Sequence, residues 1–204
     1  MRIAINHRPV ILKTAARLFG RRSFHEVRME DVALSVGIAK GSIYRFYRTK
    51  EQLYADVCLE SVGKLTRTLR TIARTRASAR SRLTTMVKGV AEHFSGQRDF
   101  FQIIQREWSG ACMSKRAAFL AQRAEAVALF AGVLREGQAE GSFRHVKPKA
   151  TADMLLGMIR SSVRFGDPRQ SPKQMTRLIL NVFLYGLLKH STGKQKRATK
   201  KGNH

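Results

Sequence analysis

Residues 36–53 read V-G-I-A-K-G-S-I-Y-R-F-Y-R-T-K-E-Q-L, and this stretch sets two glycines beside a short basic and aromatic segment. Gly37 suits the end of a helix, because glycine readily takes up the left-handed conformation of a turn. Gly41 is harder to explain by packing, since glycine inside a helix costs about 1 kcal/mol relative to alanine. Close docking on a partner explains Gly41, because a missing side chain lets the backbone approach another molecule.

The rest of the chain is predicted to be helical as well. Apolar residues recur at helical spacing, turn signals such as Gly166-Asp167-Pro168 separate the segments, and no stretch keeps a two-residue alternation. The first turn of one helix holds Glu30 and Asp31, which suit the helix dipole, and Thr49 is placed to cap another. We therefore predict an all-α fold of about nine helices, at residues 9–20, 29–36, 40–47, 49–75, 79–95, 97–112, 115–138, 149–165 and 172–190.

The second and third of these segments have the spacing of a helix-turn-helix. The small residue Ala33 lets the two helices approach, and Ile38, Ile43 and Phe46 are expected to bury the inner side of the 40–47 helix. Tyr47 falls nearer the buried side as well. The outer side is left for DNA, and the polar stripe on it consists of Lys40, Gly41, Tyr44, Arg45 and Arg48.

Charge is the most unusual feature of the composition. Lys and Arg number 39 against 14 Asp and Glu, which gives a net charge of +25 and favours a polyanionic partner. Cys58 and Cys112 stand alone, so neither a disulfide framework nor a zinc site is predicted. We find no apolar run near the roughly 18 residues of a membrane span and no signal peptide, so we expect a cytoplasmic protein.

Two runs in the N-terminal region combine these features in one pattern. They read I-L-K-T-A-A-R-L-F-G at 11–20 and M-E-D-V-A-L-S-V-G-I-A-K-G-S-I-Y-R-F-Y-R-T-K-E-Q-L at 29–53. Together they resemble the DNA-binding domain of the tetracycline-repressor (TetR) family of bacterial transcriptional regulators. The resemblance covers about a fifth of the chain and implies a homodimeric repressor that binds a palindromic operator and is released by a small-molecule effector.

The resemblance also implies roles for single residues. Lys40, Gly41, Tyr44 and Arg45 would face base edges or the adjoining backbone, while Ser42 and Lys50 would hold phosphates; Tyr44 is the strongest of these candidates. The family usually has a pair of threonines before the second helix, where this chain has Val27 and Arg28. Arg28 could still contact a phosphate, but a side-chain cap is lost.

The remainder of the chain has only general features of the family. We expect residues 1–50 to be the helix-turn-helix domain, 51–190 a helical domain for ligand binding and dimerisation, and 191–204 a basic, disordered tail. Amphipathic spacing near the end favours a four-helix dimer interface, with ordinary core packing within one chain as the alternative. The predicted interface residues are Met175, Leu178, Ile179, Val182, Phe183 and Gly186.

A ligand cavity is expected among the helices between residues 79 and 138. This region holds many large, adaptable side chains, although any one of them could be plain core: Met86, Phe94, Phe100, Phe101, Ile104, Trp108, Met113, Phe119 and Phe130. Trp108 is the favoured lining residue because a buried indole N–H needs a partner. The predicted lining residues are Met86, Phe101, Glu107, Trp108, Met113 and Met158, and the excess of arginine suggests an anionic ligand.

Two other classes of protein fit parts of the sequence. A sequence-independent DNA- or RNA-binding module would account for the net charge, and a small-molecule binding protein or enzyme with a vestigial N-terminal motif would account for the C-terminal region. The ordered stripe from Lys40 to Arg48 favours neither. No catalytic combination of Ser, His, Cys or carboxylates stands out, and the scattered histidines lack metal-ligand spacing, so we predict no enzymatic activity, no cofactor and no metal.

Overall fold

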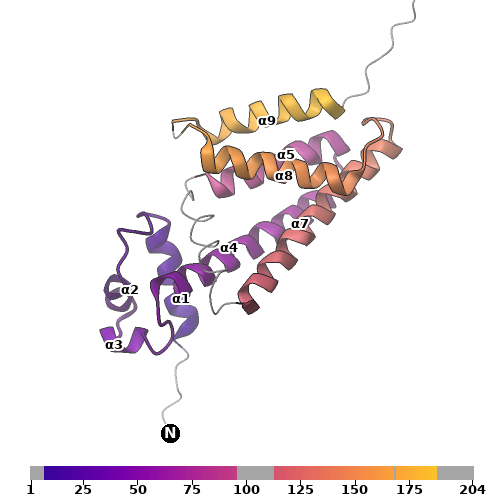
Figure 1. Ribbon diagram of the computed structural model, residues 1–204. Helices are drawn as coiled ribbons and strands as arrows, with labels where there is room; N and C mark the ends of the chain where they lie inside the picture. Colours follow the sequence, from indigo (N-terminus) through magenta and orange to yellow (C-terminus); the bar gives the residue numbers. More distant parts are fainter. Residues whose placement is uncertain (1–6, 96–112, 168, 188–204) are drawn as a thin grey trace, which may run out of the picture.

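The computed structural model describes residues 7–95, 113–167 and 169–187. Within these ranges every regular element is an α-helix, and helices are found at most of the predicted positions (Figure 1). The predicted helix at 97–112 lies outside the described residues. The helices are α1 (Arg8–Phe19), α2 (Met29–Val36), α3 (Lys40–Ile43), α4 (Lys50–Ala73), α5 (Ala79–Phe94), α7 (Met113–Ala139), α8 (Pro148–Phe165) and α9 (Pro172–Leu187).

The first three helices and the start of α4 enclose a small core of their own. Its buried residues are Ile11, Ala15, Val27, Met29, Val32, Ala33, Ile43, Tyr47 and Leu53. Gly37 has a φ of +81°, the left-handed conformation predicted for the turn, and the N–H of Ile38 donates to the carbonyl of Ala33 at 3.0 Å. This turn sets α2 and α3 in the helix-turn-helix arrangement.

The third helix is shorter than the sequence predicts, and only one of the two aromatic residues expected on its inner side is buried. The α-helix ends at Ile43, and the chain continues in tight turns to Phe46, whose N–H donates to the carbonyl of Ile43 at 3.0 Å. Tyr47 fills the small core and is 1% exposed, as predicted, and its neighbour Phe46 is left 36% exposed, so the predicted burial of Phe46 was wrong.

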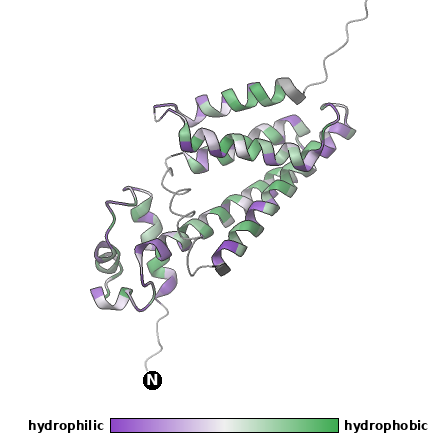
Figure 2. Cartoon of the chain, viewed as in Figure 1, coloured by the Kyte–Doolittle hydropathy of each residue, from purple (hydrophilic) through white to green (hydrophobic). Residues whose placement is uncertain are grey.

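The larger core lies among α4, α5, α7, α8 and α9. Here α4 packs chiefly against α7, α7 against α8, and α9 against α5. The fully buried residues at the centre of this core include Leu69, Leu83, Met86, Phe130, Leu134, Leu155 and Ile159. Hydrophobic residues run along α4 and α7 where these two helices pack together (Figure 2).

Helix α7 contains a long apolar segment. By length and composition, the segment Lys115–Ala139 of α7 could cross a membrane, which corrects the expectation that no such segment exists. It packs between α4 and α8, with Val127, Phe130 and Leu134 buried. Helix α4 joins the two cores, because its N-terminal end packs on α1 and its later turns pack on α5 and α7.

Candidate nucleic-acid interface and ligand cavity

The outer side of α3 and the turns after it is open to solvent. Lys40, Gly41, Arg45 and Arg48 are exposed, and the ring of Tyr44 remains 41% exposed although aromatic side chains are usually more buried. A methyl group added at Gly41 would meet no atom within 4 Å. The fold therefore leaves the backbone at Gly41 accessible to a docking partner, and the predicted stripe lies on one open surface.

One residue of this stripe is already paired within the domain. The ammonium of Lys40 lies 2.8 Å from Oε1 of Glu30, which links α3 to the first turn of α2. This hydrogen bond raises the pKa of Lys40 and lowers the pKa of Glu30. Both groups are fully charged at neutral pH, and a DNA phosphate would compete with Glu30 for the same ammonium.

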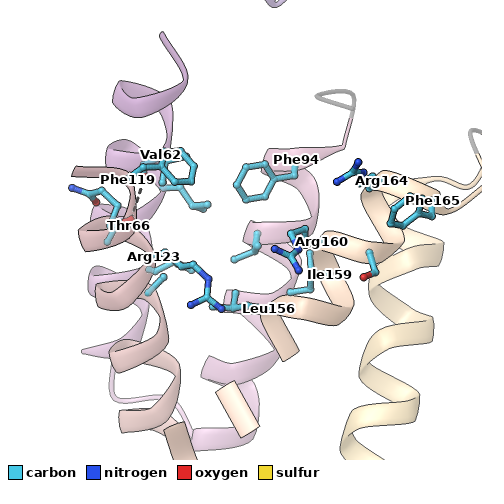
Figure 3. Close-up of a pocket in the computed structure, with 16 residues that line it drawn as sticks. Val62, Thr66, Phe94, Phe119, Arg123, Leu156, Ile159, Arg160, Arg164 and Phe165 are labelled. Carbon is cyan, nitrogen blue, oxygen red and sulfur yellow. Dashed lines mark hydrogen bonds between the residues drawn. The ribbon is translucent and has the colours of Figure 1, made fainter. Parts of the chain in front are cut away.

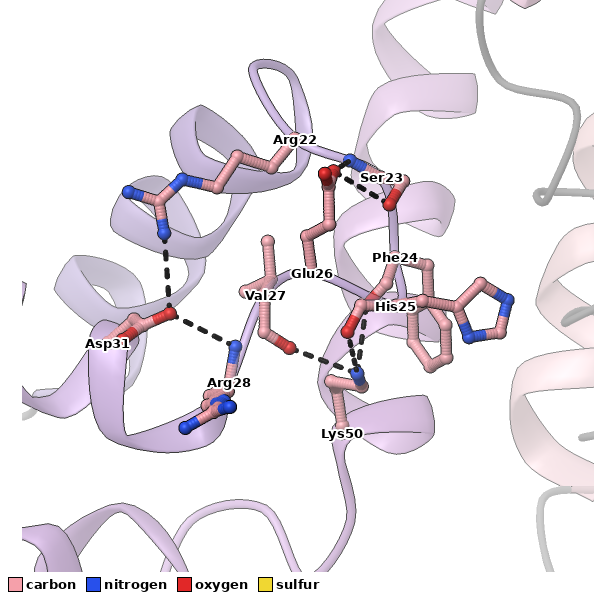
Figure 4. Close-up of polar contacts among 9 residues, drawn as sticks. All are labelled: Arg22, Ser23, Phe24, His25, Glu26, Val27, Arg28, Asp31 and Lys50. Carbon is pink, nitrogen blue, oxygen red and sulfur yellow. Dashed lines mark hydrogen bonds and ion pairs between the residues drawn. The ribbon is translucent and has the colours of Figure 1, made fainter.

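The start of α2 replaces the missing side-chain cap in another way (Figure 4). The main-chain N–H of Arg28 donates to Oδ2 of Asp31 at 3.2 Å, and Nη1 of Arg22 reaches the same oxygen at 3.4 Å. No side chain at position 28 caps the helix, as expected from the loss of threonine. Asp31 thus orders the helix start, and the guanidinium of Arg28 remains exposed.

The ammonium of Lys50, which is predicted to hold a phosphate, already binds carbonyl groups within the domain. Its ammonium donates to the carbonyls of Phe24 at 2.8 Å and Val27 at 2.9 Å, and it lies 4.3 Å from the centre of the Phe24 ring (Figure 4). These contacts hold the loop between α1 and α2 against the start of α4. A phosphate contact would have to compete with two carbonyl oxygens, so the structure gives Lys50 a packing role.

A cluster of charged groups joins the helix-turn-helix to the larger bundle. The carboxylate of Asp56 on α4 lies 2.9 Å from Nη2 of Arg8 on α1 and 2.7 Å from the ammonium of Lys115 on α7. The guanidinium of Arg8 also lies 5.5 Å from the centre of the Tyr47 ring, and its hydrogen bond to Asp56 raises the pKa of Arg8. Lys115 donates as well to the carbonyl of Gln52 at 3.1 Å. Local sequence patterns do not reveal this cluster, because its members are far apart in the chain.

A cavity of about 500 Å³ lies between α4, α5, α7 and α8. Apolar and aromatic side chains form most of its wall, among them Val62, Leu65, Leu69, Val90, Phe94, Phe119, Leu156 and Ile159. Figure 3 shows Phe94 and Phe119 facing the same space from α5 and α7. Such a volume and lining are typical of a site for an apolar small molecule.

Three arginines line the same cavity. Arg123 extends from α7, and Arg160 and Arg164 come from α8, on the other side of the space (Figure 3). Nη2 of Arg123 lies 2.7 Å from Oδ1 of Asp153, and the guanidinium of Arg164 lies 5.0 Å from the centre of the Phe165 ring. Within the described ranges, Arg160 makes no ion pair. The cavity therefore combines an apolar interior with a cationic side.

Two family models together match most of the chain. The model of bacterial regulatory proteins of the tetR family matches residues 11–57, and the model of the tetracyclin repressor-like C-terminal domain matches residues 76–187. The second match alone covers more than half of the 204 residues. The chain belongs to the TetR family. It is thus a transcriptional regulator with a DNA-binding helix-turn-helix domain, in a family of regulators and not of enzymes.

Individual TetR-family relatives resemble this chain along nearly their whole length. The HTH-type transcriptional repressor KstR2 of Mycolicibacterium smegmatis is 28% identical over 189 residues, which covers 89% of this chain and 91% of the relative. The crystal structure of PfmR from Thermus thermophilus has a TM-score of 0.68 at 21% identity, with 88% and 99% of the two chains covered. FadR from Bacillus subtilis, solved in complex with stearoyl-CoA, has a TM-score of 0.65 at 18% identity, with 86% and 97% covered.

The structure separates the residues predicted to line the ligand site of this TetR-family chain. Phe101, Glu107 and Trp108 lie outside the described residues, and so does the side chain of Met113. Met86 is fully buried in the main core, and Met158 packs against that core; neither lines the cavity. Their positions around α5 and α8 turn them toward other helices. Phe94 and Phe119, noted in the wider apolar set, do line it.

The residues predicted to form the dimer interface also divide into two groups. Met175 and Ile179 are buried in the core of their own chain, and Phe183 packs partly against it. Leu178 and Val182, one helical turn apart on α9, are 56% and 59% exposed. Gly186 lies in α9, at a position whose burial the structure does not describe. α9 thus supplies core packing on one face and an exposed apolar surface on another, and the dimer contact stays a prediction for the exposed face.

Proposed function

We propose that the protein is a cytoplasmic, homodimeric repressor that binds a palindromic operator through α3 and leaves it when a small molecule occupies the cavity. The observation that carries the proposal is that one pair of helices serves both regions. α4 and α7 line the cavity, and Asp56 and Lys115 of the same two helices meet the helix-turn-helix domain through Arg8. A ligand that separates or rotates α4 and α7 would thereby move the DNA-binding domain.

The exposed apolar side chains of α8 and α9 support the dimer. Met154 and Phe165 on α8 join Leu178 and Val182 on α9 as large apolar groups in contact with solvent. Soluble monomers rarely leave several such groups on neighbouring helices, and burying them against a second copy removes this apolar area from water. A twofold dimer would present two copies of α3 to DNA about 34 Å apart, which requires an inverted repeat.

The DNA contacts would divide into two kinds. Exposed Arg28, Arg45 and Arg48 are placed for phosphates and supply affinity that depends on salt. Tyr44, Gly41 and Lys40 lie on the outer side of α3, where contacts to base edges supply sequence preference. Ser42 is half-buried beside them and is placed for a phosphate.

The chemistry of the cavity favours an effector with an apolar body and an anionic group. The apolar wall would bind the body, and the guanidinium groups of Arg123 and Arg160 would bind a carboxylate, a phosphate or a thioester-linked nucleotide at the cationic side. FadR of Bacillus subtilis was solved with stearoyl-CoA, a molecule of this type. Fatty acids and their coenzyme A thioesters are therefore the first class to test.

The experiment has two steps with full-length protein. Bound sequences are selected from a random duplex pool near 0.15 M salt, and an inverted repeat is expected; recovery of bulk DNA alone would contradict the operator and favour sequence-independent binding. Stearoyl-CoA, stearate and stearylamine are then titrated into the complex. The two anions should release DNA and the cationic amine should not. By linkage, operator must weaken effector binding by the same factor, typically about 5–150-fold.

A further inference from the structure

The end of the bundle farthest from the helix-turn-helix carries a concentrated positive charge. We call it the distal basic cluster; it consists of Arg74, Arg76, Arg80, Arg135, Arg144, Lys147 and Lys149. Three parts of the chain meet there: the connection from α4 to α5, the end of α7 and the connection from α7 to α8 (Figure 1). Nη1 of Arg82 donates to the carbonyl of Ala73 at 2.8 Å and lies 2.6 Å from Glu136, which ties these parts together.

The charges of this cluster are not neutralised by the protein itself. All seven side chains are exposed, and in the described part of the chain none of them has an ion-pair partner. The segments that form the cluster, 73–80 and 135–149, contain two acidic residues, Glu136 and Glu140. Both carboxylates face the buried guanidinium of Arg82, at 2.6 and 3.9 Å. The cluster therefore presents an excess of exposed positive charge to solvent.

Helix stability does not account for three of these charges. Arg80 and Lys149 lie in the first turns of α5 and α8, and Lys147 is the residue before α8. Cations near a helix N-terminus are unfavourable because of the helix dipole, and neither first turn contains an acidic residue that would offset them. Mutual repulsion among seven neighbouring cations adds to this cost. Replacing some of them by neutral residues should thus leave the fold as stable or more stable.

The cluster is also too far from α3 to strengthen binding of the same DNA. α4 connects the two ends, and its 24 residues span about 36 Å. That length is several times the Debye length of about 8 Å at physiological ionic strength, so these charges are screened from a duplex held by α3. A partner of the cluster must therefore be a separate molecule or a distant segment of the same DNA.

We propose that the distal basic cluster binds a second DNA duplex without sequence preference, so that the repressor can bridge two DNA segments. Five of the seven cations are arginines, whose planar forks suit phosphate oxygens. The large exposed apolar side chains of the described residues all lie elsewhere, and Phe143, the aromatic residue of this end, is buried. The cluster thus offers no apolar anchor for a membrane and no stacking surface for single-stranded bases.

The first test compares two triple variants of equal charge change in full-length protein. The cluster variant carries Arg76→Gln, Arg80→Gln and Arg144→Gln; the control carries Arg67→Gln, Arg116→Gln and Lys173→Gln, at exposed positions outside the cluster. Both are built on Arg45→Ala with Arg48→Ala, so that the outer side of α3 contributes little. Affinity for a short duplex of arbitrary sequence is measured between about 50 and 200 mM salt. The cluster variant should lower the salt slope by about 3 relative to its parent, and the control by less than about 1.

The second test asks directly for bridging. A duplex bearing the selected operator is fixed to beads and saturated with protein, and capture of a labelled duplex lacking that site is measured. Protein with intact α3 should capture it, and the three cluster substitutions should reduce capture at least tenfold while operator affinity stays unchanged. An unchanged slope, unchanged capture, or preferential binding of double-stranded RNA or anionic vesicles over DNA would overturn the proposal. The first test needs no operator, so it can support or contradict the distal basic cluster even if the protein proves not to be an operator-binding repressor.

Discussion

The carboxylate of Asp56 lies 2.7 Å from the ammonium of Lys115, and this ion pair joins α4 to the first turn of α7. Both helices line the cavity. Asp56 also binds Arg8 at 2.9 Å. Phe119 and Arg123, which line the cavity, follow Lys115 by four and eight residues and so lie along the same side of α7. Displacement of α7 by an effector would be transmitted through Lys115 and Asp56 to α1.

Asp56→Asn should therefore uncouple the two regions. The side chain of Asp56 is 13% exposed and meets two cations, of which Arg8 is largely solvated, so the substitution should cost about 1–2 kcal/mol of unfolding free energy. The factor by which effector weakens operator binding should fall toward 1. Urea unfolding and operator titration with and without stearoyl-CoA measure both effects. Lys64→Gln, which removes the exposed pair with Glu60, should change neither; full coupling in the Asp56→Asn protein would exclude this route.

Gly41→Ala should separate stability from DNA binding. Because an added methyl group meets no atom within 4 Å, alanine should stabilise the protein by about 0.5–1 kcal/mol. The same methyl group should obstruct close approach of DNA and weaken operator binding at least tenfold. Gly89→Ala is the matched control, since it also lies in a helix with no neighbour within 4 Å and is far from α3. Equal operator affinities of the two variants would show that the backbone at Gly41 does not approach DNA.

Filling the cavity should yield a repressor that no longer responds to effector. Ala126 lines the cavity from α7, and Ala126→Phe would occupy part of the 500 Å³ at little cost to the fold, because the space is open. Effector affinity should fall at least tenfold by calorimetry while operator affinity is retained. Ala128→Phe, on the exposed side of the same helix, should leave effector binding unchanged. If both variants respond normally, the effector binds elsewhere.

The exposed turn of α9 should be required for dimerisation. Leu178→Glu with Val182→Glu places two like charges where apolar contact is proposed, and sedimentation should show a shift from dimer to monomer with loss of operator affinity. Leu120→Glu, at an exposed apolar position on α7, is the control. Because all three side chains are exposed, the fold of a single chain should survive. A dimer that persists in the double variant would place the interface on another surface.

The stability of the protein should fall below about pH 6.5 because of His93. Its Nε2 lies 3.3 Å from Oγ of Ser61 between α4 and α5, and burial lowers the pKa of His93. The unfolded chain therefore binds a proton near pH 6.5 that the folded chain does not, so acidification favours unfolding and stability is fully present above that pH. His93→Gln should flatten the decline seen between about pH 7 and pH 5.5 in urea unfolding. An unchanged decline would assign it to other groups.

Local patterns in the sequence were sufficient for most of the helices and for the exposure of the polar stripe on α3. Gly37 required a left-handed turn, Thr49 accepts a hydrogen bond from the N–H of Gln52 at 3.2 Å as a helix cap, and the outer stripe of α3 is exposed as predicted. Each of these features depends on residues within a few positions of one another. Prediction failed first at Phe46, which was expected beside Tyr47 on the buried side but is 36% exposed where the chain leaves the α-helix.

The cavity, the Asp56 cluster and the distal basic cluster could not have been located in the same way. Arg8, Asp56 and Lys115 are separated by 48 and 59 residues, and the cavity wall draws on four helices. The helical period and the side-chain chemistry can be read from the sequence alone. They determined the all-α fold and the helix-turn-helix, and the positive charge favours an anionic partner. Tertiary packing alone decided which apolar residues became core, which were left facing an open space and which charges met, because these outcomes depend on how helices distant in the chain rotate against one another.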